Sequence, residues 1–311
     1  MTSTESPCNI APAIKAKAAE LGFDACGFAH AAPVSTEAAK VFCTWLDEGK
    51  NDCMAWAENY RELRLDPTKL VPGAKTVISL AVNYLPQRLQ PADVPQVARY
   101  AYGDDYHEVV RDMARQLAQF IKENTGHDSR ICVDSAPILE RYWAVQAGIG
   151  FIGLNTQLIL PGRGSQFFLC ELVTTLDLPA DEPCTLTCGN CHACEKACPG
   201  GALSNGVLDA ARCLSCQTIE NHAEQLPEWV ADAIGNRLYG CDECQKCCPH
   251  NRRATPTQNP AFQPRDAVKN ISLASIDAMT QEQFSAAFRH SPIKRTKLQG
   301  LQRNAHLLKN D

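Results

Sequence analysis

Apolar residues recur every three to four positions in two early stretches of the chain, and this spacing predicts helices. The first covers residues 10–20 and stops before Gly22, which can end a helix in a left-handed conformation. The second has its apolar positions within residues 109–121, and either Asp104 or Asp105 can cap it. Both helices would therefore place one apolar face against a core.

Continuous apolar runs, which indicate buried strands, lie between and after these helices. Residues 75–84 are rich in Val, Ile and Leu and follow a Pro-Gly turn, and residues 130–133 form a shorter run. Residues 157–160 and 167–173 look like two strands joined by the turn PGRG. We therefore predict a mixed α/β (α+β) domain over residues 1–180.

The pattern changes after this domain. The segment LPADE (178–182) reads as a linker, and residues 181–252 are rich in cysteine. Residues 253–311 have little strand signal and read as helical after a proline-rich start. A chain of 311 residues has room for these parts. The predicted order is an α/β domain, a cysteine-rich domain and a short helical tail.

Charge is unevenly distributed along the chain. The whole chain has a net charge of −5, but residues 250–311 carry ten Lys and Arg against four Asp and Glu. Such a basic segment is either a solvated helix face or a surface that contacts phosphates. The charge pattern leaves both readings open.

Neither a leader nor a membrane span is visible in the sequence. The first ten residues are polar and lack a basic region followed by an apolar one. The longest apolar run, residues 76–85, is far shorter than the ~18–20 residues of a spanning helix. We therefore expect a cytoplasmic protein without a membrane partner.

Seventeen cysteines are the strongest chemical signal. The run CGNCHACEKACP has the spacing C-x2-C-x2-C-x3-C-P, whose fourth cysteine ligates the other cluster in two-cluster ferredoxins. A second run, CDECQKCCP, supplies Cys241, Cys244 and Cys248. Cys213, which lies between the two runs, completes eight ligands. The sequence thus predicts one 4Fe–4S cluster on Cys188, Cys191, Cys194 and Cys248, and a second on Cys198, Cys213, Cys241 and Cys244.

Alternatives exist for some of these thiols. Cys213-x2-Cys216 and Cys241-x2-Cys244 could form a zinc ribbon, although zinc would leave the first run unexplained. Cys216 and Cys247 are the two spare cysteines of the segment, and either could replace an assigned ligand. The remaining seven are read as small buried hydrophobic residues, namely Cys8, Cys26, Cys43, Cys53, Cys132, Cys170 and Cys184.

Asp134 follows the predicted strand 130–133 and precedes a helix predicted over residues 138–146. It, or Ser135, could cap that helix, with Pro137 in the first turn. An acid at the carboxyl end of a strand also lies where α/β proteins bind ligands. Residue chemistry alone allows both roles.

Several segments together resemble one known family, the epoxyqueuosine reductases, which are cobalamin-dependent iron–sulfur enzymes of tRNA modification. The resemblance covers nearly the whole chain, and the combination is specific although each element apart from the cysteines is weak. The segments are residues 64–75, ARYAYGDDYH (98–107), VDSAPILER (133–141), GIGFIGLNT (148–156), CELV (170–173) and both cysteine runs.

The resemblance implies reduction of the epoxide of epoxyqueuosine at the tRNA wobble position to give queuosine. It makes residues 1–180 a cobalamin-binding catalytic domain and residues 181–252 a ferredoxin-like domain with two 4Fe–4S clusters. It implies Asp134 as the proton donor, a role that requires burial to raise its pKa above the ordinary ~3.9. Arg64, Ser135 and Arg141 would join Asp134 at the cofactor, and Tyr106 and His107 would contact the substrate.

The same resemblance implies cobalt held without a histidine ligand. The sequence agrees, because Val110 stands where the D-x-H-x-x-G cobalamin signature has glycine, and we read Asp105 as a helix cap. Implied partners are tRNA, bound by the basic tail, and an external flavodoxin- or ferredoxin-like electron donor that supplies the clusters. We expect the protein to act as a monomer.

The chain departs from the family pattern at three positions. Leu154 stands where relatives usually have Lys, Phe151 where they have Trp, and His250 where Trp is common. A different substrate would follow if the Lys matters, so one rival is a dehalogenase-like cobalamin reductase of a small molecule. A second rival is a non-catalytic ferredoxin-type electron carrier, which would bind no corrin.

Overall fold

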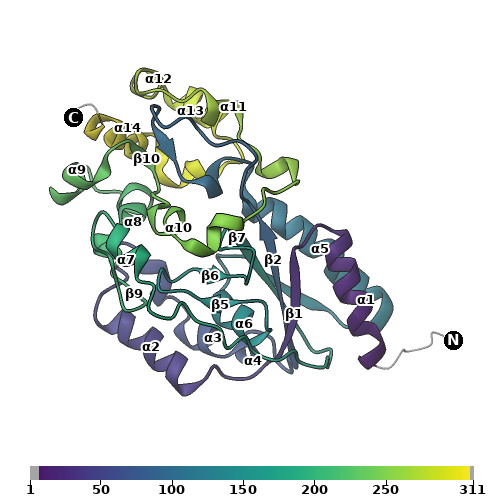
Figure 1. Ribbon diagram of the computed structural model, residues 1–311. Helices are drawn as coiled ribbons and strands as arrows, with labels where there is room; N and C mark the ends of the chain where they lie inside the picture. The colour runs from purple at the N-terminus through teal and green to yellow at the C-terminus, as the bar shows by residue number, and fades with distance from the viewer. Residues whose placement is uncertain (1–6, 309–311) are drawn as a thin grey trace.

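The computed structural model describes residues 7–308, and a four-stranded sheet lies at its centre (Figure 1). The strand order is β1-β2-β7-β4, and each neighbouring pair is antiparallel. Every residue of β2 is buried, as its content of Val, Ile and Leu predicts. The strands are β1 (Ala25–His30), β2 (Thr76–Asn83), β7 (Phe167–Thr174) and β4 (Ser129–Cys132).

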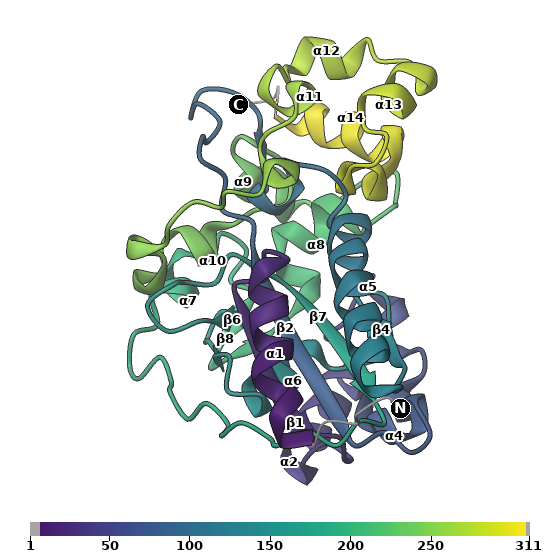
Figure 2. The ribbon, with the colours of Figure 1, turned by 90° about the vertical axis from the view of Figure 1, so that its right-hand side faces the viewer.

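Two long helices, α1 (Pro7–Glu20) and α5 (Tyr106–Thr125), cover one face of this sheet (Figure 2). Their apolar stripes bury Ile14 and Leu117 completely, together with Leu80 and Leu172 from the sheet. Both helices were predicted from the apolar spacing. The predicted cap is also confirmed, because the Asp105 side chain accepts a hydrogen bond from the His107 N–H at 3.0 Å.

Shorter helices cover the opposite face. The buried side chains of Trp143 and Leu70 pack there against Val77 and Val173 of the sheet. The predicted strand at 157–160 forms as β6, which pairs with β5 in a separate hairpin rather than with β7. These elements are α2 (Thr36–Asp47), α3 (Arg61–Leu65), α4 (Pro67–Leu70), α6 (Glu140–Gln146), β5 (Phe151–Ile152) and β6 (Leu158–Ile159).

The cysteine-rich segment consists of short helices joined by tight turns. The helices α7 and α10, one from each cysteine run, contact each other. Its elements are α7 (Ala193–Ala197), β8 (Leu203–Ser204), β9 (Val207–Leu208), α8 (Leu214–Ile219), α9 (Trp229–Ile234), β10 (Arg237–Tyr239) and α10 (Glu243–Lys246). The 3-10 helices of the chain are η1 (Ala55–Glu58), η2 (Arg99–Ala101), η3 (Ala210–Arg212), η4 (Pro249–Arg253), η5 (Pro260–Phe262) and η6 (Pro292–Thr296).

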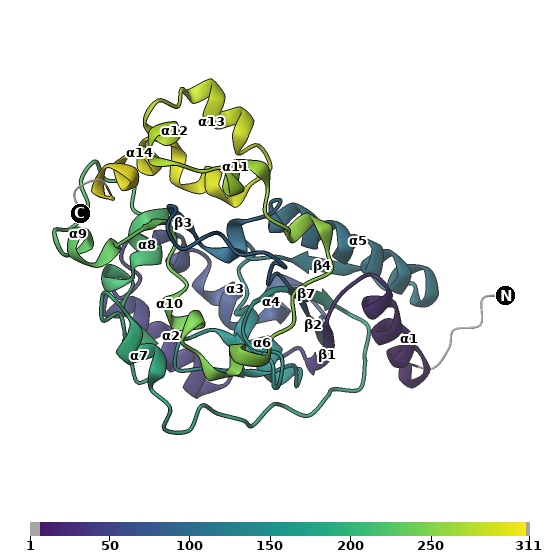
Figure 3. The same cartoon turned by 45° about the horizontal axis from the view of Figure 1, so that its top comes forward.

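The last segment is helical, as predicted, and lies at one end of the molecule (Figure 3). Its helices share one buried cluster with Tyr102 and Tyr239, because β3 (Gln96–Val97) pairs in parallel with β10. The predicted boundaries at 180 and 252 stay a prediction, since this cluster joins all three segments. The helices are α11 (Asp266–Lys269), α12 (Leu273–Asp277), α13 (Gln281–Ala287) and α14 (Lys297–Leu307).

The tail also fixes the beginning of α5. The backbone N–H of Asp105 donates to the carbonyl of His290 at 2.8 Å, and the His290 ring pairs with Glu108 at 2.8 Å. The N–H of Asp104 donates to the carbonyl of Ala261 at 2.7 Å. Within residues 7–308, no helix combines the length and apolarity that crossing a membrane requires.

Candidate functional site

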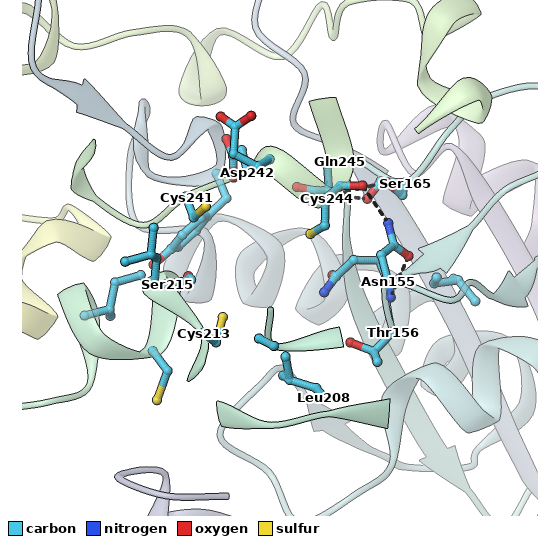
Figure 4. Close-up of a pocket in the computed structure, with 18 of the residues that line it drawn as sticks. Asn155, Thr156, Ser165, Leu208, Cys213, Ser215, Cys241, Asp242, Cys244 and Gln245 are labelled. Atoms are coloured by element: carbon cyan, nitrogen blue, oxygen red, sulfur yellow. Dashed lines mark hydrogen bonds between the residues drawn. The ribbon is translucent and has the colours of Figure 1, made fainter. Parts of the chain in front are cut away.

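The second predicted cysteine set converges on one space. The sulfurs of Cys213, Cys241 and Cys244 point toward it from the N-cap of α8, from the turn before α10 and from α10 itself (Figure 4). Burial, followed by the nearby thiols of Cys213, Cys241 and Cys198, raises the pKa of Cys244 well above its usual value. Cys198 follows α7, and its sulfur accepts a hydrogen bond from the Ala202 N–H at 3.2 Å. The structure therefore brings all four predicted ligands together.

The first predicted set gathers around α7, which carries Cys194. Burial raises the pKa of Cys248, and the neighbouring thiols of Cys188 and Cys191 raise it further. Burial raises the pKa of Cys194 to about 11, with smaller contributions from Cys247 and Cys188. Cys247 thus lies beside the same set, and the choice of Cys248 over Cys247 stays a prediction.

The two sets fit iron–sulfur clusters, because thiolates in groups of four are the ligands that such clusters use. Cluster binding requires these thiols to lose their protons, so assembly of the clusters would overcome the raised pKa values. Cys216 lines the same cavity, but its sulfur contacts that of Cys53, at 2.8 Å, and the groups that act on its pKa are Cys53, Cys213 and Asp52 rather than Cys198, Cys241 or Cys244. This placement supports Cys213 as the ligand and Cys216 as the spare thiol.

A large cavity begins at the second cysteine set. It holds about 1710 Å³ of space, part of it open to solvent. Its wall includes Cys198, Cys213, Cys241 and Cys244 at one end. Elsewhere the wall is formed by three tyrosines and a group of charged side chains, namely Tyr84, Tyr100, Tyr106, Asp134, Glu140 and Arg141. A single space therefore connects the cysteines with Asp134.

Asp134 belongs to a chain of hydrogen-bonded side chains. Its Oδ2 lies 2.8 Å from Nε2 of His107, whose Nδ1 lies 2.7 Å from Oδ1 of Asp105. The ring of Tyr106 stacks between His107 and Phe168, at centroid distances of 4.0 and 4.3 Å. The imidazole is therefore held in one orientation, with both nitrogens engaged.

The capping role considered for Asp134 and Ser135 is wrong. The helix α6 begins only at Glu140, with Leu139 at its N-cap position and no side-chain cap. Asp134 instead adopts a left-handed conformation, with a φ of 52°. In this turn its backbone N–H donates to Oε1 of Glu140 at 2.6 Å, and its carboxyl group reaches His107.

The electrostatics of this group differ from the expectation. Burial lowers the pKa of His107, but its hydrogen bonds to Asp105 and Asp134 outweigh burial and raise the pKa to about 9. Burial raises the pKa of Asp134, yet hydrogen bonding and charge from His107 and the nearby Arg141 lower it overall. These interactions favour an ionised Asp134 beside a protonated His107, and the rise expected for Asp134 beside a bound corrin stays a prediction.

Glu140 is a functional-site residue that the sequence reasoning missed. Burial, followed by the charge of Asp134, raises its pKa to about 8. The sequence signal was present, because Glu140 precedes Arg141 in the segment VDSAPILER. An acid there also suits the first turn of a helix, so its contact with Asp134 could not be inferred from the pattern.

The other predicted site residues are placed differently. Arg64 is buried, donates to the carbonyls of Asn59 and Trp56, and lies near Asp134 and Glu140, whose charges partly offset the lowering of its pKa by burial. Arg141 lines the cavity. Ser135 does not line it, and its Oγ lies 3.4 Å from the carbonyl oxygen of Val133.

The three departures from the family pattern lie near the first cysteine set. The rings of Phe151 and His250 are in edge contact at 5.5 Å, and Phe151 packs with Cys248. The N–H of Leu154 donates to the sulfur of Cys188 at 3.4 Å. Leu154 does not line the cavity, so its side chain is not placed to contact a molecule bound there.

The basic tail divides into structural and exposed charges. Arg295 forms an ion pair with Glu220 at 2.6 Å, and Arg303 donates to the carbonyls of Asn221 and Ala223. These two cations therefore hold the tail to α8 and the residues that follow it. The side chains of Arg289, Lys294 and Lys297 are exposed.

The raised pKa of His107 predicts a pH-dependent stability. Its ordinary value is 6.5 and its folded value about 9, so the stabilisation is complete below pH 6.5 and is lost as pH rises through 9. We expect the free energy of unfolding of the cofactor-free protein, measured by urea titration, to fall across this window. In His107→Gln the fall should be smaller, because only the part below about pH 8 that comes from the raised pKa of Glu140 remains, and an unchanged slope would contradict the assignment.

Comparison with known proteins gives consistent matches. Residues 64–135 match the family described as "Epoxyqueuosine reductase QueG, DUF1730", and residues 187–251 match the "4Fe-4S double cluster binding domain". An epoxyqueuosine reductase of Cyclobacterium marinum is 41% identical over 303 residues, covering 96% of both chains.

Solved structures agree with these sequence matches. A crystal structure of an epoxyqueuosine reductase with a tRNA-Tyr epoxyqueuosine-modified stem loop superposes with a TM-score of 0.87 at 29% identity, covering 96% of this chain and 80% of that one. A Bacillus subtilis epoxyqueuosine reductase, described with its catalytic aspartate loop swung out of the active site, gives 0.85 at 29% identity, with coverages of 96% and 81%.

Proposed function

Because the chain belongs to the epoxyqueuosine reductase family, a family of oxidoreductases, we propose that it reduces epoxyqueuosine in tRNA to queuosine. The reaction would use cobalamin and two 4Fe–4S clusters, with Asp134 as the proton donor. The observation that carries this proposal is the single cavity lined by both the second cysteine set and Asp134. It supports an electron-transfer group and a proton donor acting on one molecule bound in this cavity.

The side chains that line the cavity suit a large planar cofactor. Tyr84, Tyr100 and Tyr106 supply aromatic faces and hydroxyls, and Arg141 supplies a cation beside Asp134. Both nitrogens of His107 are engaged by carboxylates, so this ring does not offer a nitrogen to a metal. This agrees with cobalt held without a histidine ligand. When bound there, cobalamin would supply a low-valent cobalt centre that delivers electrons to the epoxide.

The protein's own residues would handle the protons. Converting an epoxide to an alkene and water consumes two electrons and two protons, and an oxygen that leaves as alkoxide requires protonation. Asp134 is half-exposed toward the cavity and hydrogen-bonded to the protonated His107. We therefore propose that His107 passes its proton to Asp134, which delivers it to the departing oxygen. Arg141 would stabilise the carboxylate that remains.

The two cysteine sets suggest a direction of electron flow. The second set lines the cavity, whereas Cys191 of the first set is exposed. The clusters, once assembled, would transfer single electrons from the exposed set to the cavity. We propose that a cytoplasmic flavodoxin- or ferredoxin-like reductase supplies them, and that the protein acts as a monomer.

Full reconstitution tests the proposed function. The protein, loaded anaerobically with iron, sulfide and cobalamin and then reduced, should convert an epoxyqueuosine stem loop into a product lighter by one oxygen, as measured by mass spectrometry. Dehalogenation of a halogenated phenol without this conversion would favour the small-molecule rival. Failure to alter the absorbance of added cobalamin would favour the electron-carrier rival.

The tail should contribute to RNA affinity through its exposed cations. Each phosphate contact steepens the dependence of binding on salt by roughly one unit, because counterions are released. Changing Arg289, Lys294 and Lys297 together to Ala should weaken binding of an anticodon stem loop and reduce the salt slope by roughly two to three units, as measured by fluorescence anisotropy.

A matched triple variant separates this effect from a general loss of charge. Lys40, Lys69 and Lys122 are exposed or half-exposed on α2, α4 and α5, and changing them to Ala removes the same charge. This control should retain the salt slope. An equal reduction of the salt slope in both variants would indicate a nonspecific electrostatic attraction. An unchanged salt slope in the tail variant would indicate that these cations form only a solvated helix face. Arg295 is left intact because it holds Glu220.

A further inference from the structure

Two thiols outside the predicted cluster ligands lie in direct contact. Cys53 is in the turn after α2, and Cys216 is on α8, 163 positions later in the chain. Their sulfurs are 2.8 Å apart, and a carboxylate oxygen of Asp52 lies within 4.8 Å of both. Cys216 is 5% exposed, whereas Cys53 is half-buried. Neither thiol has a role in the proposed reaction.

The contact lies where two segments of the chain, residues 45–53 and 208–217, are hydrogen-bonded to each other. The indole of Trp45 donates to the carbonyl of Leu208 at 2.7 Å, and the amide of Gln217 donates to Asp52 at 3.0 Å. The N–H of Ala210 donates to the carbonyl of Lys50 at 2.9 Å. These bonds hold residues 45–53 against residues 208–217. The two thiols therefore lie on segments that are already held side by side.

A metal site explains the arrangement less well than a covalent bond. Two thiolates on one tetrahedral zinc ion, with Zn–S bonds of about 2.3 Å, would lie about 3.8 Å apart. The observed separation is shorter, and Asp52 already accepts a hydrogen bond from Gln217. The geometry thus favours a direct sulfur–sulfur bond, whose length is about 2.05 Å.

We propose that Cys53 and Cys216 form a redox-active dithiol that converts reversibly into a disulfide by exchange with an external disulfide of the glutathione class. Cys53, the more accessible thiol, would attack the external disulfide as thiolate and release one glutathione. Cys216, also as thiolate, would then attack the sulfur of Cys53 and release the second. Two protein thiols are oxidised, one external disulfide is reduced to two thiols, and their protons pass to the departing thiolates.

The bond would connect two walls of the cavity. Met54 and Trp56 line it immediately after Cys53, and Cys216 lines it on the other side together with Cys213. The indole of Trp56 also lies 3.3 Å from Glu220 just beyond α8. Oxidation would therefore fix the turn at 53–56 against the helix that begins at a predicted cluster ligand. A covalent link across so long a loop also restricts the unfolded chain.

The test uses the full chain with both clusters reconstituted under anaerobic conditions. Oxidised glutathione is added, free thiols are alkylated, and peptides are mapped by mass spectrometry. We expect one linked peptide pair containing Cys53 and Cys216, two glutathiones released per chain, unchanged iron content and full reversal by dithiothreitol. Thermal unfolding should shift to a higher temperature after oxidation. This experiment on the unaltered protein does not depend on any variant folding.

Variants then assign the bond. Cys53→Ser and Cys216→Ser should each abolish the linked peptide and the thermal shift while retaining iron, whereas Cys43→Ser, on α2, should change neither. A stable glutathione adduct on Cys53 without a link, or a link mapped to another pair, would overturn the proposal. Loss of iron in Cys216→Ser would also overturn it, because Cys216 would then be a cluster ligand.

Discussion

Asp134→Asn is expected to lower queuosine formation at least ~100-fold while leaving both clusters and cobalamin binding intact. General acid catalysis typically contributes ~100- to 10,000-fold, equivalent to about 3–5 kcal/mol of barrier. Asparagine retains the size of aspartate and tolerates the left-handed conformation seen at this position. It cannot accept the proton of His107 and pass it on. Single-turnover assays on the corrin-loaded variant measure the loss directly.

A second measurement distinguishes proton transfer from positioning. Asp134 is one of the two carboxylates that raise the pKa of His107, so the variant should lower that pKa from about 9, as followed by NMR of the ring. Asp128→Asn, just before the same strand β4, is the matched control and should leave both activity and the His107 pKa unchanged. Near-normal turnover by the corrin-loaded Asp134→Asn protein would exclude the proposed donor.

Cys213→Ser should remove one cluster and abolish turnover, whereas Cys216→Ser should retain both. The two cysteines are three residues apart at the start of α8, but only Cys213 lies with Cys198, Cys241 and Cys244. Two 4Fe–4S clusters hold eight irons, so the first variant should retain about four per chain by iron assay. The opposite result would make Cys216 the ligand and Cys213 the spare thiol. One zinc with four irons in the unaltered protein would contradict the prediction of two 4Fe–4S clusters.

Local sequence patterns were sufficient for the elements that form the core. The spacing of Val109 to Ile121 predicted α5, and a run rich in Val, Ile and Leu predicted β2, because burial on one or both sides imposes these patterns directly. Cysteine spacing likewise predicted two sets of ligands, since the gaps within a cluster loop are short and fixed. These features depend on residues that are close in the sequence.

The catalytic group could be predicted only in part. Asp134 was singled out, but its left-handed turn and its bond to Glu140 depend on where α6 begins, and a proline-containing segment left that point ambiguous. The pKa of His107 depends on Asp105 and Asp134 together. These contacts join residues from α5 and the end of β4. No pattern within a single segment encodes such a pairing.

The hydrogen bonds between His290 of the tail and the beginning of α5 give the C-terminal helices a role beyond RNA contact. His290 follows Arg289, one of the proposed phosphate contacts, and its carbonyl accepts the N–H of Asp105, whose side chain orients His107. Only a few covalent and hydrogen bonds thus separate the tail surface from the imidazole that holds the proton. A displacement of this surface by a docked anticodon arm would be transmitted to the proton donor. Binding of the RNA substrate would then change the acid strength of the His107–Asp134 pair.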